Sequence, residues 1–464
     1  MIRVLGQYVA PRTVVLAITD STLLVASIAL AAWIRFGSIA DATWYLSQPY
    51  AAAQICIATS ICWICLYYYD LYNMEVIARR AELMVHLMQA LGTTALLLAL
   101  LYYFLPDLAL GRGVSLLAAA IVCVSLLAWR LGVDSGKFFR PAHRVLIAGT
   151  GEGGIRLVRD IVRRPDLNLK VVGFLDEKGE RIGQPLVNPG IVGGVSDITD
   201  MVRRERVDWV VLAFAERRGV MPAMDLLRLR LSGVRVEEAH SVYENLTGRV
   251  MLDRLSPSWL FLSEGFRKDY LRMLAKRITD VVISSAALIL LFPVCLLISV
   301  AIFLESGGPI LFRQERVGFE GRIFKILKFR SMVKDAESNG PQWAMQGDAR
   351  ITRVGKILRN YRLDEIPQLV NVLKGDMSLV GPRPERPEFV KLLGEQIPYF
   401  VERQSVRPGI TGWAQVKYQY VSSVEGAKTK LEYDLFYIKH LSFFLDLTIV
   451  LRTVQVVLFA RGSL

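Results

Sequence analysis

The chain has 464 residues, of which 53% are hydrophobic and 21% are charged, and its formal net charge is +13. The high apolar fraction excludes an intrinsically disordered chain, and the charged fraction is too large for a protein built only of membrane helices. The composition therefore predicts membrane segments joined to soluble domains. Basic residues are spread over the chain rather than concentrated in one domain, so we expect contacts with anionic lipid and phosphorylated substrates, and no nucleic acid.

Four apolar runs in the first third of the chain each approach the ~20 residues that a helix needs to cross a bilayer. They cover residues 13–34, 50–69, 83–105 and 113–133. Lys and Arg are concentrated before the first run, between the second and third, and after the fourth. By the positive-inside rule, this distribution places the N-terminus and the chain after the fourth run in the cytoplasm. Residues 1–140 are therefore predicted to form four transmembrane helices.

A soluble α/β domain is predicted over residues 141–263. The short apolar strand 144–148 leads into Gly149, Gly151 and Gly154, which have the G-x-G-x-x-G spacing of a dinucleotide-binding loop. Asp176 ends the next predicted strand, where an acid that binds ribose would lie. A tight turn from strand to helix needs the same glycines. The motif thus fits a bound nucleotide or a purely structural turn, and either way it predicts a Rossmann-like fold.

A fifth apolar run, residues 281–303, contains no charged residue. Clusters of Lys and Arg flank both of its ends, which places both ends on the same side of the membrane. Pro293 lies in the middle of the run, where it removes a helix hydrogen bond. These features favour a re-entrant helix that breaks near Pro293 and returns to the cytoplasmic face. The alternative is an ordinary fifth span with a tolerated proline.

The C-terminal part contains two adjacent carboxylates, Asp364 and Glu365, at the predicted start of a short helix. Acids at this position are ordinary helix caps. A helix N-terminus also attracts phosphate, and two carboxylates could divide the tasks of attacking phosphorus and holding a divalent metal. Oxygen ligands beside a pyrophosphate suit Mg²⁺. The turn Gly381-Pro382-Arg383-Pro384 then presents one guanidinium, a group that matches phosphate oxygens.

The segment 276–453 resembles the bacterial sugar transferases, which are monotopic phosphoglycosyl transferases and include the undecaprenyl-phosphate hexose-1-phosphate transferases. The matching stretches occur in order, and they are Lys276-Arg277 with Asp280; Phe312 with Gln314, Arg316, Gly318, Gly321 and Phe324; Lys328-Phe329-Arg330-Ser331-Met332; Leu363-Asp364-Glu365-Ile366-Pro367-Gln368-Leu369; Gly375-Asp376-Met377-Ser378-Leu379-Val380-Gly381-Pro382-Arg383-Pro384; Arg407-Pro408-Gly409-Ile410-Thr411-Gly412; and Tyr433-Asp434. The four predicted spans and the middle domain match the large, exopolysaccharide-type members of the group.

This resemblance implies a mainly α-helical catalytic domain over residues 264–464, on the cytoplasmic face of the bacterial inner membrane. Asp364 would attack the β-phosphate of a UDP-hexose and expel UMP. Undecaprenyl phosphate would then attack the phosphosugar-aspartyl intermediate, in the first membrane step of exopolysaccharide, O-antigen or capsule assembly. Glu365 would assist, and Mg²⁺ held by both carboxylates would neutralise the pyrophosphate.

The resemblance also assigns roles to basic residues around the two acids. The residues expected to bind the nucleotide or lipid phosphates are Lys328, Arg330, Arg383 and Arg316. The residues expected at the membrane interface are Lys276, Arg277 and Asp280. The sequence names neither the sugar, for which glucose or galactose is the first expectation, nor the ligand of the middle domain, and it leaves a homodimer open.

Two other functions are compatible with parts of the sequence. A membrane-bound nucleotide-sugar dehydratase or epimerase would share the four spans and the first α/β domain. It would also need a second glycine-rich nucleotide fold and a Tyr-x-x-x-Lys pair, and the sequence after residue 263 contains neither. In a non-enzymatic membrane scaffold, the two carboxylates would only cap a helix.

Overall fold

The computed structural model describes residues 2–4, 7–9, 11–72, 80–134, 142–164, 167–214, 221–252, 265–266, 269–334, 348, 350–418 and 423–458. The chain divides into two compact units, Met1–Glu237 and Glu238–Leu464. The expected boundary between the middle and C-terminal domains, at residue 263, lies outside the described residues.

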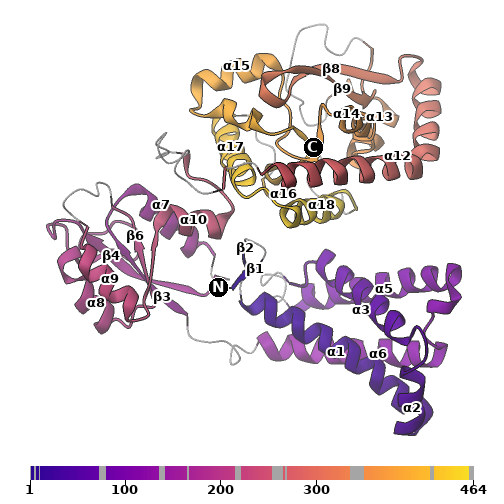
Figure 1. The fold of residues 1–464 in the computed structure, drawn as a ribbon, viewed down its shortest axis with the longest axis horizontal. Coiled ribbons are helices and arrows are strands. Elements are labelled where there is room, and N and C mark those ends of the chain that lie inside the picture. Colours follow the sequence, from indigo (N-terminus) through magenta and orange to yellow (C-terminus); the bar gives the residue numbers. More distant parts are fainter. Residues whose placement is uncertain are drawn as a thin grey trace. The chain divides into compact units, whose positions relative to one another are not determined.

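The first unit contains the four predicted spans as long helices (Figure 1). They are α1 (Pro11–Phe36), α3 (Ala51–Tyr68), α5 (Arg80–Phe104) and α6 (Arg112–Asp134), with the hairpin β1 (Ile2–Val4) and β2 (Gln7–Val9) before them and the short helix α2 (Ile39–Leu46) after α1. Each of the four is long and apolar enough to cross a membrane. Leu66 and Leu87 are fully buried between helices, whereas Leu96 and Leu116 are about three-quarters exposed, as lipid-facing side chains would be. The prediction of four apolar helices is therefore confirmed.

A buried ion pair joins the first and last of these helices. Asp20 of α1 is 0% exposed and Arg130 of α6 is 1% exposed. Arg130 Nη2 donates to Asp20 Oδ2 at 2.5 Å, and Arg130 Nη1 donates to the carbonyl oxygen of Leu71. Burying an unpaired charge among apolar helices costs free energy, and the opposite charge of the partner offsets part of that cost for each of these two side chains.

The rest of the first unit is an α/β fold around a five-stranded sheet. The strand order is β5-β4-β3-β6-β7, and β3 pairs in parallel with both β4 and β6. The strands are β3 (His143–Ala148), β4 (Leu169–Asp176), β5 (Ile191–Gly194), β6 (Trp209–Leu212) and β7 (Arg235–Glu238). Counted from the first strand, this is the order 3-2-1-4-5 of a doubly wound fold, which confirms the predicted parallel α/β architecture.

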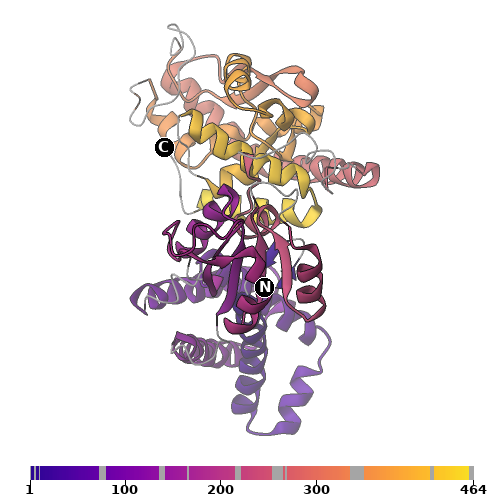
Figure 2. The ribbon, with the colours of Figure 1, turned by 90° about the vertical axis from the view of Figure 1, so that its left-hand side faces the viewer.

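Helices cover both faces of this sheet (Figures 1 and 2). Leu146 of β3 shares a buried cluster with residues of α8 (Ile198–Arg204) and α9 (Ala223–Leu231). The next side chain, Ile147, points to the opposite face, where it packs against Gly154 of α7 (Glu152–Val162). The alternation of side chains along β3 therefore accounts for the two helical layers.

The second unit is mainly α-helical and contains two small sheets, one antiparallel and one parallel. Its elements are α10 (Ala239–Thr247), α12 (Tyr270–Ser306), β8 (Leu311–Val317), β9 (Ile323–Phe329), α13 (Arg353–Asn360), η6 (Leu363–Glu365), α14 (Gln368–Lys374), β10 (Ser378–Val380), α15 (Pro387–Gln396), η7 (Phe400–Ser405), β11 (Gly409–Thr411), α16 (Trp413–Lys417), α17 (Val424–Lys439) and α18 (Phe443–Leu458). Its core is built around Phe400, Trp413, Phe436 and Tyr437, and it includes Val250, which follows α10.

The helix α10 belongs to this second unit although it follows the last strand of the first-unit sheet without a linker. Glu244 of α10 accepts hydrogen bonds from Lys439 Nζ at 2.8 Å and pairs with His440 Nε2 at 2.7 Å. Trp413 Nε1 donates to the carbonyl oxygen of Gly248 at 2.9 Å. These contacts make the segment that contains α10 a structural part of the C-terminal unit.

The fifth apolar run forms the second part of α12, a helix of 37 residues with Pro293 inside it. Figure 1 shows that α12 turns sharply part-way along its length, as a helix does where a proline removes a hydrogen bond. Leu290 and Leu297 on either side of Pro293 are more than two-thirds exposed. An exposed apolar stretch of this kind on a bent helix fits contact with lipid.

Both ends of α12 are tied to the second unit. Near its start, Arg277 donates to the carbonyl oxygens of Val372 and Leu373 at 2.6 and 2.9 Å, and Lys276 forms an ion pair with Asp446 at 2.7 Å. Asp280, which is buried, accepts hydrogen bonds from Ser378 Oγ and Leu379 N at 2.7 and 3.1 Å. At its end, the carboxylate of Glu305 caps α13 by accepting from the backbone N–H groups of Arg353 and Val354. The three residues predicted at the interface thus fasten the helix to the protein.

Candidate active site

Asp364 and Glu365 lie in η6, a single 3-10 turn between the basic helix α13 and the short helix α14. The sequence predicts that the two acids open the helix, but the structure starts α14 at Gln368. Pro367 has no N–H to donate, and the turn before it is closed by 3-10 hydrogen bonds from Glu365 N to Arg362 O and from Ile366 N to Leu363 O. Asp364 and Glu365 are each 8% exposed. The two carboxylates, here called the dyad, therefore lie in a 3-10 turn and not in the first turn of α14.

Two cations from distant parts of the chain converge on Glu365. Lys328, at the end of β9, places its Nζ atom 2.9 Å from Glu365 Oε1. Arg383, in the loop after β10, places Nη2 2.8 Å from the same oxygen. The structure thus brings together Lys328, Arg383 and the dyad, as expected of a phosphate site.

The surroundings of the dyad shift the pKa values of its two carboxylates in opposite directions. Burial opposes the ionisation of Glu365, but the adjacent charges of Arg383 and Lys328 outweigh it and hold the pKa of Glu365 well below its ordinary value. Burial raises the pKa of Asp364 above its ordinary value, and the charge of Glu365 adds to this effect while Lys328 opposes it. Burial also disfavours the charged form of Lys328 and therefore lowers its pKa. The two cations therefore favour the anionic form of Glu365.

Asp364 differs from Glu365 in its contacts as well. Within the described ranges of the chain, no hydrogen bond or ion pair engages the Asp364 carboxylate, whereas Glu365 Oε1 accepts two. An unengaged carboxylate in a buried, cationic setting keeps its lone pairs available for a new bond. This asymmetry makes Asp364 the candidate nucleophile and Glu365 the group that organises the cations.

The other two arginines expected to bind phosphates have different partners. Arg330, which is 6% exposed, donates through Nη2 to the carbonyl oxygens of Ser306 and Gly307 at the end of α12, at 3.1 and 2.6 Å. Arg316 donates through Nη1 to the carbonyl oxygen of Pro384 at 3.0 Å. The structure does not bring either side chain onto the dyad. Arg330 fastens the end of α12, and Arg316 supports the loop that carries Arg383.

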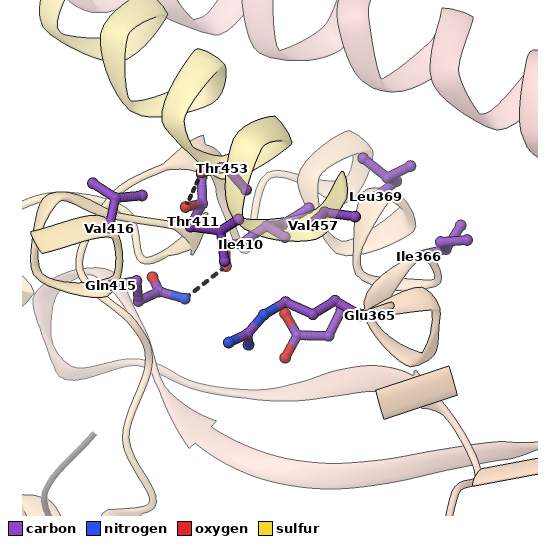
Figure 3. Close-up of a pocket in the computed structure, with 11 residues that line it drawn as sticks. Glu365, Ile366, Leu369, Ile410, Thr411, Gln415, Val416, Thr453 and Val457 are labelled. Carbon is purple, nitrogen blue, oxygen red and sulfur yellow. Dashed lines mark hydrogen bonds between the residues drawn. The ribbon is translucent and has the colours of Figure 1, made fainter. Parts of the chain in front are cut away.

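A pocket opens beside Glu365 (Figure 3). Its walls are mostly apolar and are formed by Ile366 and Leu369 near the dyad, Ile410 of β11 and Val457 of α18. Two polar contacts shape the opposite wall, because Gln415 Nε2 donates to the carbonyl oxygen of Ile410 at 3.1 Å and the hydroxyls of Thr411 and Thr453 lie 2.6 Å apart. The pocket provides space for part of a substrate beside Glu365, the one member of the dyad that lines it.

Two family patterns match the chain. The bacterial sugar transferase family matches residues 271–460, which include the dyad, Lys328 and Arg383. A second family, described as a CoA-binding domain, matches residues 68–235, which include the α/β sheet up to the start of β7.

Similar proteins are transferases that act on undecaprenyl phosphate. The chain is 30% identical over 482 residues to a UDP-glucose:undecaprenyl-phosphate glucose-1-phosphate transferase of Xanthomonas campestris pv. campestris, with 97% of this chain and 94% of the relative aligned. The chain belongs to the bacterial sugar transferase family. This transferase is also 43% identical over 238 residues to a UDP-N-acetylgalactosamine-undecaprenyl-phosphate N-acetylgalactosaminephosphotransferase of Aeromonas hydrophila, where the match covers 51% of this chain and 56% of the relative.

A third relative of the transferase is an undecaprenyl-phosphate glucose phosphotransferase of Komagataeibacter xylinus, 33% identical over 333 residues. That match covers 70% of this chain and 60% of the relative. The chain thus spans less than two-thirds of the Aeromonas and Komagataeibacter proteins but nearly all of the Xanthomonas protein.

The oxygen atoms of the dyad suit Mg²⁺ in the way that phosphate-transferring sites use it. Such sites hold the ion through one or two carboxylates, and waters and substrate phosphates complete the shell. The carboxylate of Asp364 and Glu365 Oε2 are available for this purpose, since both cations engage Oε1. Within the described ranges, no group of three or more His, Cys, Asp and Glu side chains forms a separate metal cage.

The glycine motif of the middle domain is explained by packing. Gly149 has a φ of +102°, and a Cβ atom there would lie 2.7 Å from the main chain of Ala213. A Cβ atom on Gly154 would lie 2.7 Å from the Ala213 side chain. Gly151 precedes α7 as its N-cap. These glycines let α7 approach the sheet closely, whether or not a ligand binds.

Asp176, the expected ribose-binding acid, already has a partner in the structure. It is 1% exposed and forms an ion pair with Arg181 at 2.8 Å. Arg181 in turn donates to Thr150 Oγ1, within the glycine loop, at 2.7 Å. The Asp176 carboxylate is thus bound to a neighbouring arginine, whereas in a dinucleotide-binding domain the acid at this position would bind the ribose.

Three residues around the dyad were given no role from the sequence, although Asp434 belongs to one of the matching stretches. Arg359 of α13 donates to Ser331 Oγ at 3.0 Å, and its charge counteracts the raised pKa of Asp364. The repeat of basic residues along 350–362 contained this signal, but most such stripes are solvated faces. Arg403 and Asp434 lie behind Arg383, and their pairing depends on tertiary contacts that sequence spacing does not contain.

Proposed function

We propose that the transferase moves a sugar-1-phosphate from a UDP-sugar to undecaprenyl phosphate and releases UMP. The observation that carries this proposal is the buried dyad, in which Lys328 and Arg383 both bind Glu365 Oε1 while no described residue binds the Asp364 carboxylate. Relatives that act on undecaprenyl phosphate support it. A dehydratase or epimerase is not favoured, because the C-terminal unit belongs to the sugar transferase family and not to a second nucleotide fold.

In the proposed reaction, Asp364 attacks the β-phosphorus of the UDP-sugar. The bond from this phosphorus to the bridging oxygen breaks, and UMP leaves with that oxygen. An oxygen of undecaprenyl phosphate then attacks the same phosphorus, which forms the lipid pyrophosphate and restores the Asp364 carboxylate. Phosphoryl-type transfer depends mainly on positioning and charge stabilisation, and Lys328 and Arg383 are placed to stabilise the charge on the phosphate oxygens. Mg²⁺ held by the dyad would supply further positive charge.

The direct test is a screen of UDP-sugars with the full-length protein in membranes that contain undecaprenyl phosphate. We expect UMP release and a lipid-linked sugar phosphate in equal amounts with one or a few sugars, with glucose, galactose and their N-acetylated forms tested first. Boiled protein and membranes without undecaprenyl phosphate are the controls. Absence of UMP release with every UDP-sugar would overturn the proposal.

The rate of UMP release is expected to fall at acid pH. Asp364 must be ionised to attack, and burial raises its pKa above the ordinary value of 3.8. A carboxylate with a raised pKa loses its charge earlier as the pH falls, so activity should decline through a midpoint above that of a free aspartate. Glu365, with its lowered pKa, stays ionised over the same range. The measurement is a single-turnover pH profile of UMP release. A rate that stays constant as the pH falls to 3.8, the ordinary pKa of an aspartate, would contradict the prediction.

We further propose that α12 is re-entrant and that the catalytic unit lies on the cytoplasmic face. Arg277 near the start of the helix and Glu305 near its end both bind elements of the same compact unit. A helix that crossed a bilayer would separate these anchors by the ~30 Å of the hydrocarbon core. The bend seen in Figure 1 removes that conflict.

Cysteine labelling should therefore find both ends of α12 on the cytoplasmic side. In a background without the native cysteines, Tyr270→Cys and Gly308→Cys are expected to react only with reagent on that side. Both sites are exposed, and a Cβ at Gly308 meets no atom within 4 Å. Gln48→Cys, between the first two spans, is the control that should react only from outside. Pro293→Ala is expected to favour spanning and lower activity, and labelling of Gly308→Cys from outside in the otherwise native helix would refute re-entrance.

Removal of residues 1–237 should leave a membrane-associated protein that still releases UMP, because the proposed chemistry needs no residue of the first unit. The cut falls at the boundary of the two compact units and keeps α10. Removal of residues 1–263 also deletes Val250 from the core and the Gly248 carbonyl from Trp413, so this shorter protein should be markedly less stable. UMP release and thermal unfolding of the two proteins are the measurements. A folded but inactive 238–464 fragment would place part of the site in the first unit.

A further inference from the structure

The loop that carries Arg383 is fixed at five consecutive residues, from Gly381 to Glu385. Three of them are held by main-chain hydrogen bonds to other segments. These bonds join Gly381 N to Thr411 O at 2.9 Å, Gly409 N to Pro382 O at 2.9 Å, and Val317 N to Glu385 O at 3.0 Å. The remaining two residues, Arg383 and Pro384, are held through their carbonyl oxygens by arginine side chains.

Arg403, which belongs to η7, is the side chain that holds Arg383. It is 7% exposed, and its Nη2 atom donates both to the carbonyl oxygen of Arg383 at 3.0 Å and to Asp434 Oδ2 at 2.8 Å. Its Nη1 atom lies 3.7 Å from Glu385 Oε1. The guanidinium also packs against the ring of Phe400, 5.1 Å from the ring centroid. Both terminal nitrogens of this guanidinium and the face over Phe400 thus have partners.

Asp434 of α17 anchors Arg403 from behind and is 1% exposed. Burial raises the pKa of Asp434 to about 6, against the effect of the charges of Arg403 and Lys430, and the charge of Glu385 adds to the rise. Without Asp434, the closest carboxylate described beside the Arg403 guanidinium would be that of Glu385, at 3.7 Å. The chain Asp434, Arg403, Arg383 carbonyl therefore connects α17 to the loop that supplies a cation to the dyad.

We infer that Arg403, held by Asp434, is a positioning residue that fixes the main chain of Arg383 and so aims its guanidinium at Glu365 and at the substrate phosphate. The inference rests on the proposed function. Arg383 reaches Glu365 across 2.8 Å, a distance that a small shift of its main chain would lengthen. Misplacement of a charge-stabilising group by about 1 Å can reduce a rate roughly 100-fold, so the support of the loop bears directly on the rate.

The test is a double-mutant cycle between Arg403 and Arg383 in the full-length protein. Arg403→Lys keeps the charge beside Asp434 but loses the planar fork that reaches both Asp434 and the Arg383 carbonyl. We expect kcat for UMP release to fall roughly 10- to 100-fold, the scale of a misplaced catalytic group, while the KM for the UDP-sugar changes little. In the Arg383→Ala background the same substitution should lower kcat by less than about threefold, because residues that act as a unit are not additive.

Arg322→Lys is the matched control, since that side chain is 80% exposed and pairs only loosely with Glu320, at 3.9 Å. If Arg403→Lys does not fold, Asp434→Asn takes its place in the cycle with the same expected values. Unchanged kcat, or an equal fold-loss in both backgrounds, would overturn the inference, because a merely structural ion pair lowers activity independently of Arg383. A wild-type protein that releases no UMP would overturn the proposed function itself, and the two failures are therefore distinguishable.

Discussion

Asp364→Asn is expected to abolish sugar-1-phosphate transfer. The amide retains the size of the carboxylate and the η6 turn, but it has neither the charge nor the nucleophilicity to attack phosphorus. Loss of a covalent nucleophile typically costs at least about 10⁴-fold in kcat. The measurement is UMP release, together with trapping of the radiolabelled sugar phosphate on the protein, which should disappear. Near-normal release by Asp364→Asn would show that another group attacks.

Glu365→Gln provides the comparison within the dyad. The amide leaves Lys328 and Arg383 without the shared anion that neutralises them. A trace of activity at most is expected, but Asp364 is intact, so a slowly formed covalent sugar phosphate should still be detectable. Equal behaviour of the two variants in the trapping experiment would contradict the division of roles between the carboxylates.

Arg383→Ala is expected to be the second largest loss. The side chain donates to Glu365, and in the proposed reaction it stabilises the charge on the substrate phosphate. Removal of one preorganised donor that stabilises the charge of a transition state costs about 10²–10³-fold in kcat, or roughly 2.7–4 kcal/mol. Because Glu365 is buried, its charge would also be left with Lys328 alone.

Steady-state kinetics with UDP-sugar separates the two effects of Arg383→Ala. A fall in kcat with a smaller change in KM indicates a contact made mainly in the transition state. Arg322→Ala, at an exposed position, controls for the loss of one positive charge. A variant in which neither kcat nor KM changes would remove Arg383 from the phosphate site.

Asp364 and Glu365 were singled out because the motifs around them resemble the sugar transferases, since two acids beside a helix start are by themselves an ordinary cap. Local sequence patterns were sufficient to predict the secondary-structure elements. The four long apolar helices and the α/β fold follow from apolar run length and from the strand-glycine-helix pattern, and the structure contains both. These features depend on neighbours in the sequence, which is why they could be predicted without coordinates.

Features that depend on tertiary contacts were not predicted. Arg330 is in a matching stretch with Lys328, yet the side chain is used to fasten the end of α12 rather than to face the dyad. Nothing in the spacing distinguishes an arginine that binds a backbone carbonyl from one that binds a phosphate. The same limit applies to Arg403 and Asp434, which are 31 residues apart in sequence and meet only in the folded unit.

The boundary of the C-terminal unit also depends on tertiary contacts that the sequence pattern does not contain. The boundary predicted at residue 263 places α10 with the middle domain. The structure assigns it to the C-terminal unit through Glu244, Gly248 and Val250. Hydrophobic pattern alone shows that a helix has a buried face, but it does not show which neighbour covers that face.

The ion pair between Asp20 and Arg130 has a consequence for how the membrane region is made. The two residues are 110 positions apart, so α1 is synthesised long before α6. Until α6 arrives, Asp20 lacks the arginine that pairs with it in the folded protein, and a lone acid within a membrane helix is poorly tolerated. The four-helix region therefore reaches electrostatic balance only when its last helix has been inserted. Biogenesis of this protein should accordingly depend on late assembly of the complete bundle, and not on stepwise release of each helix into lipid.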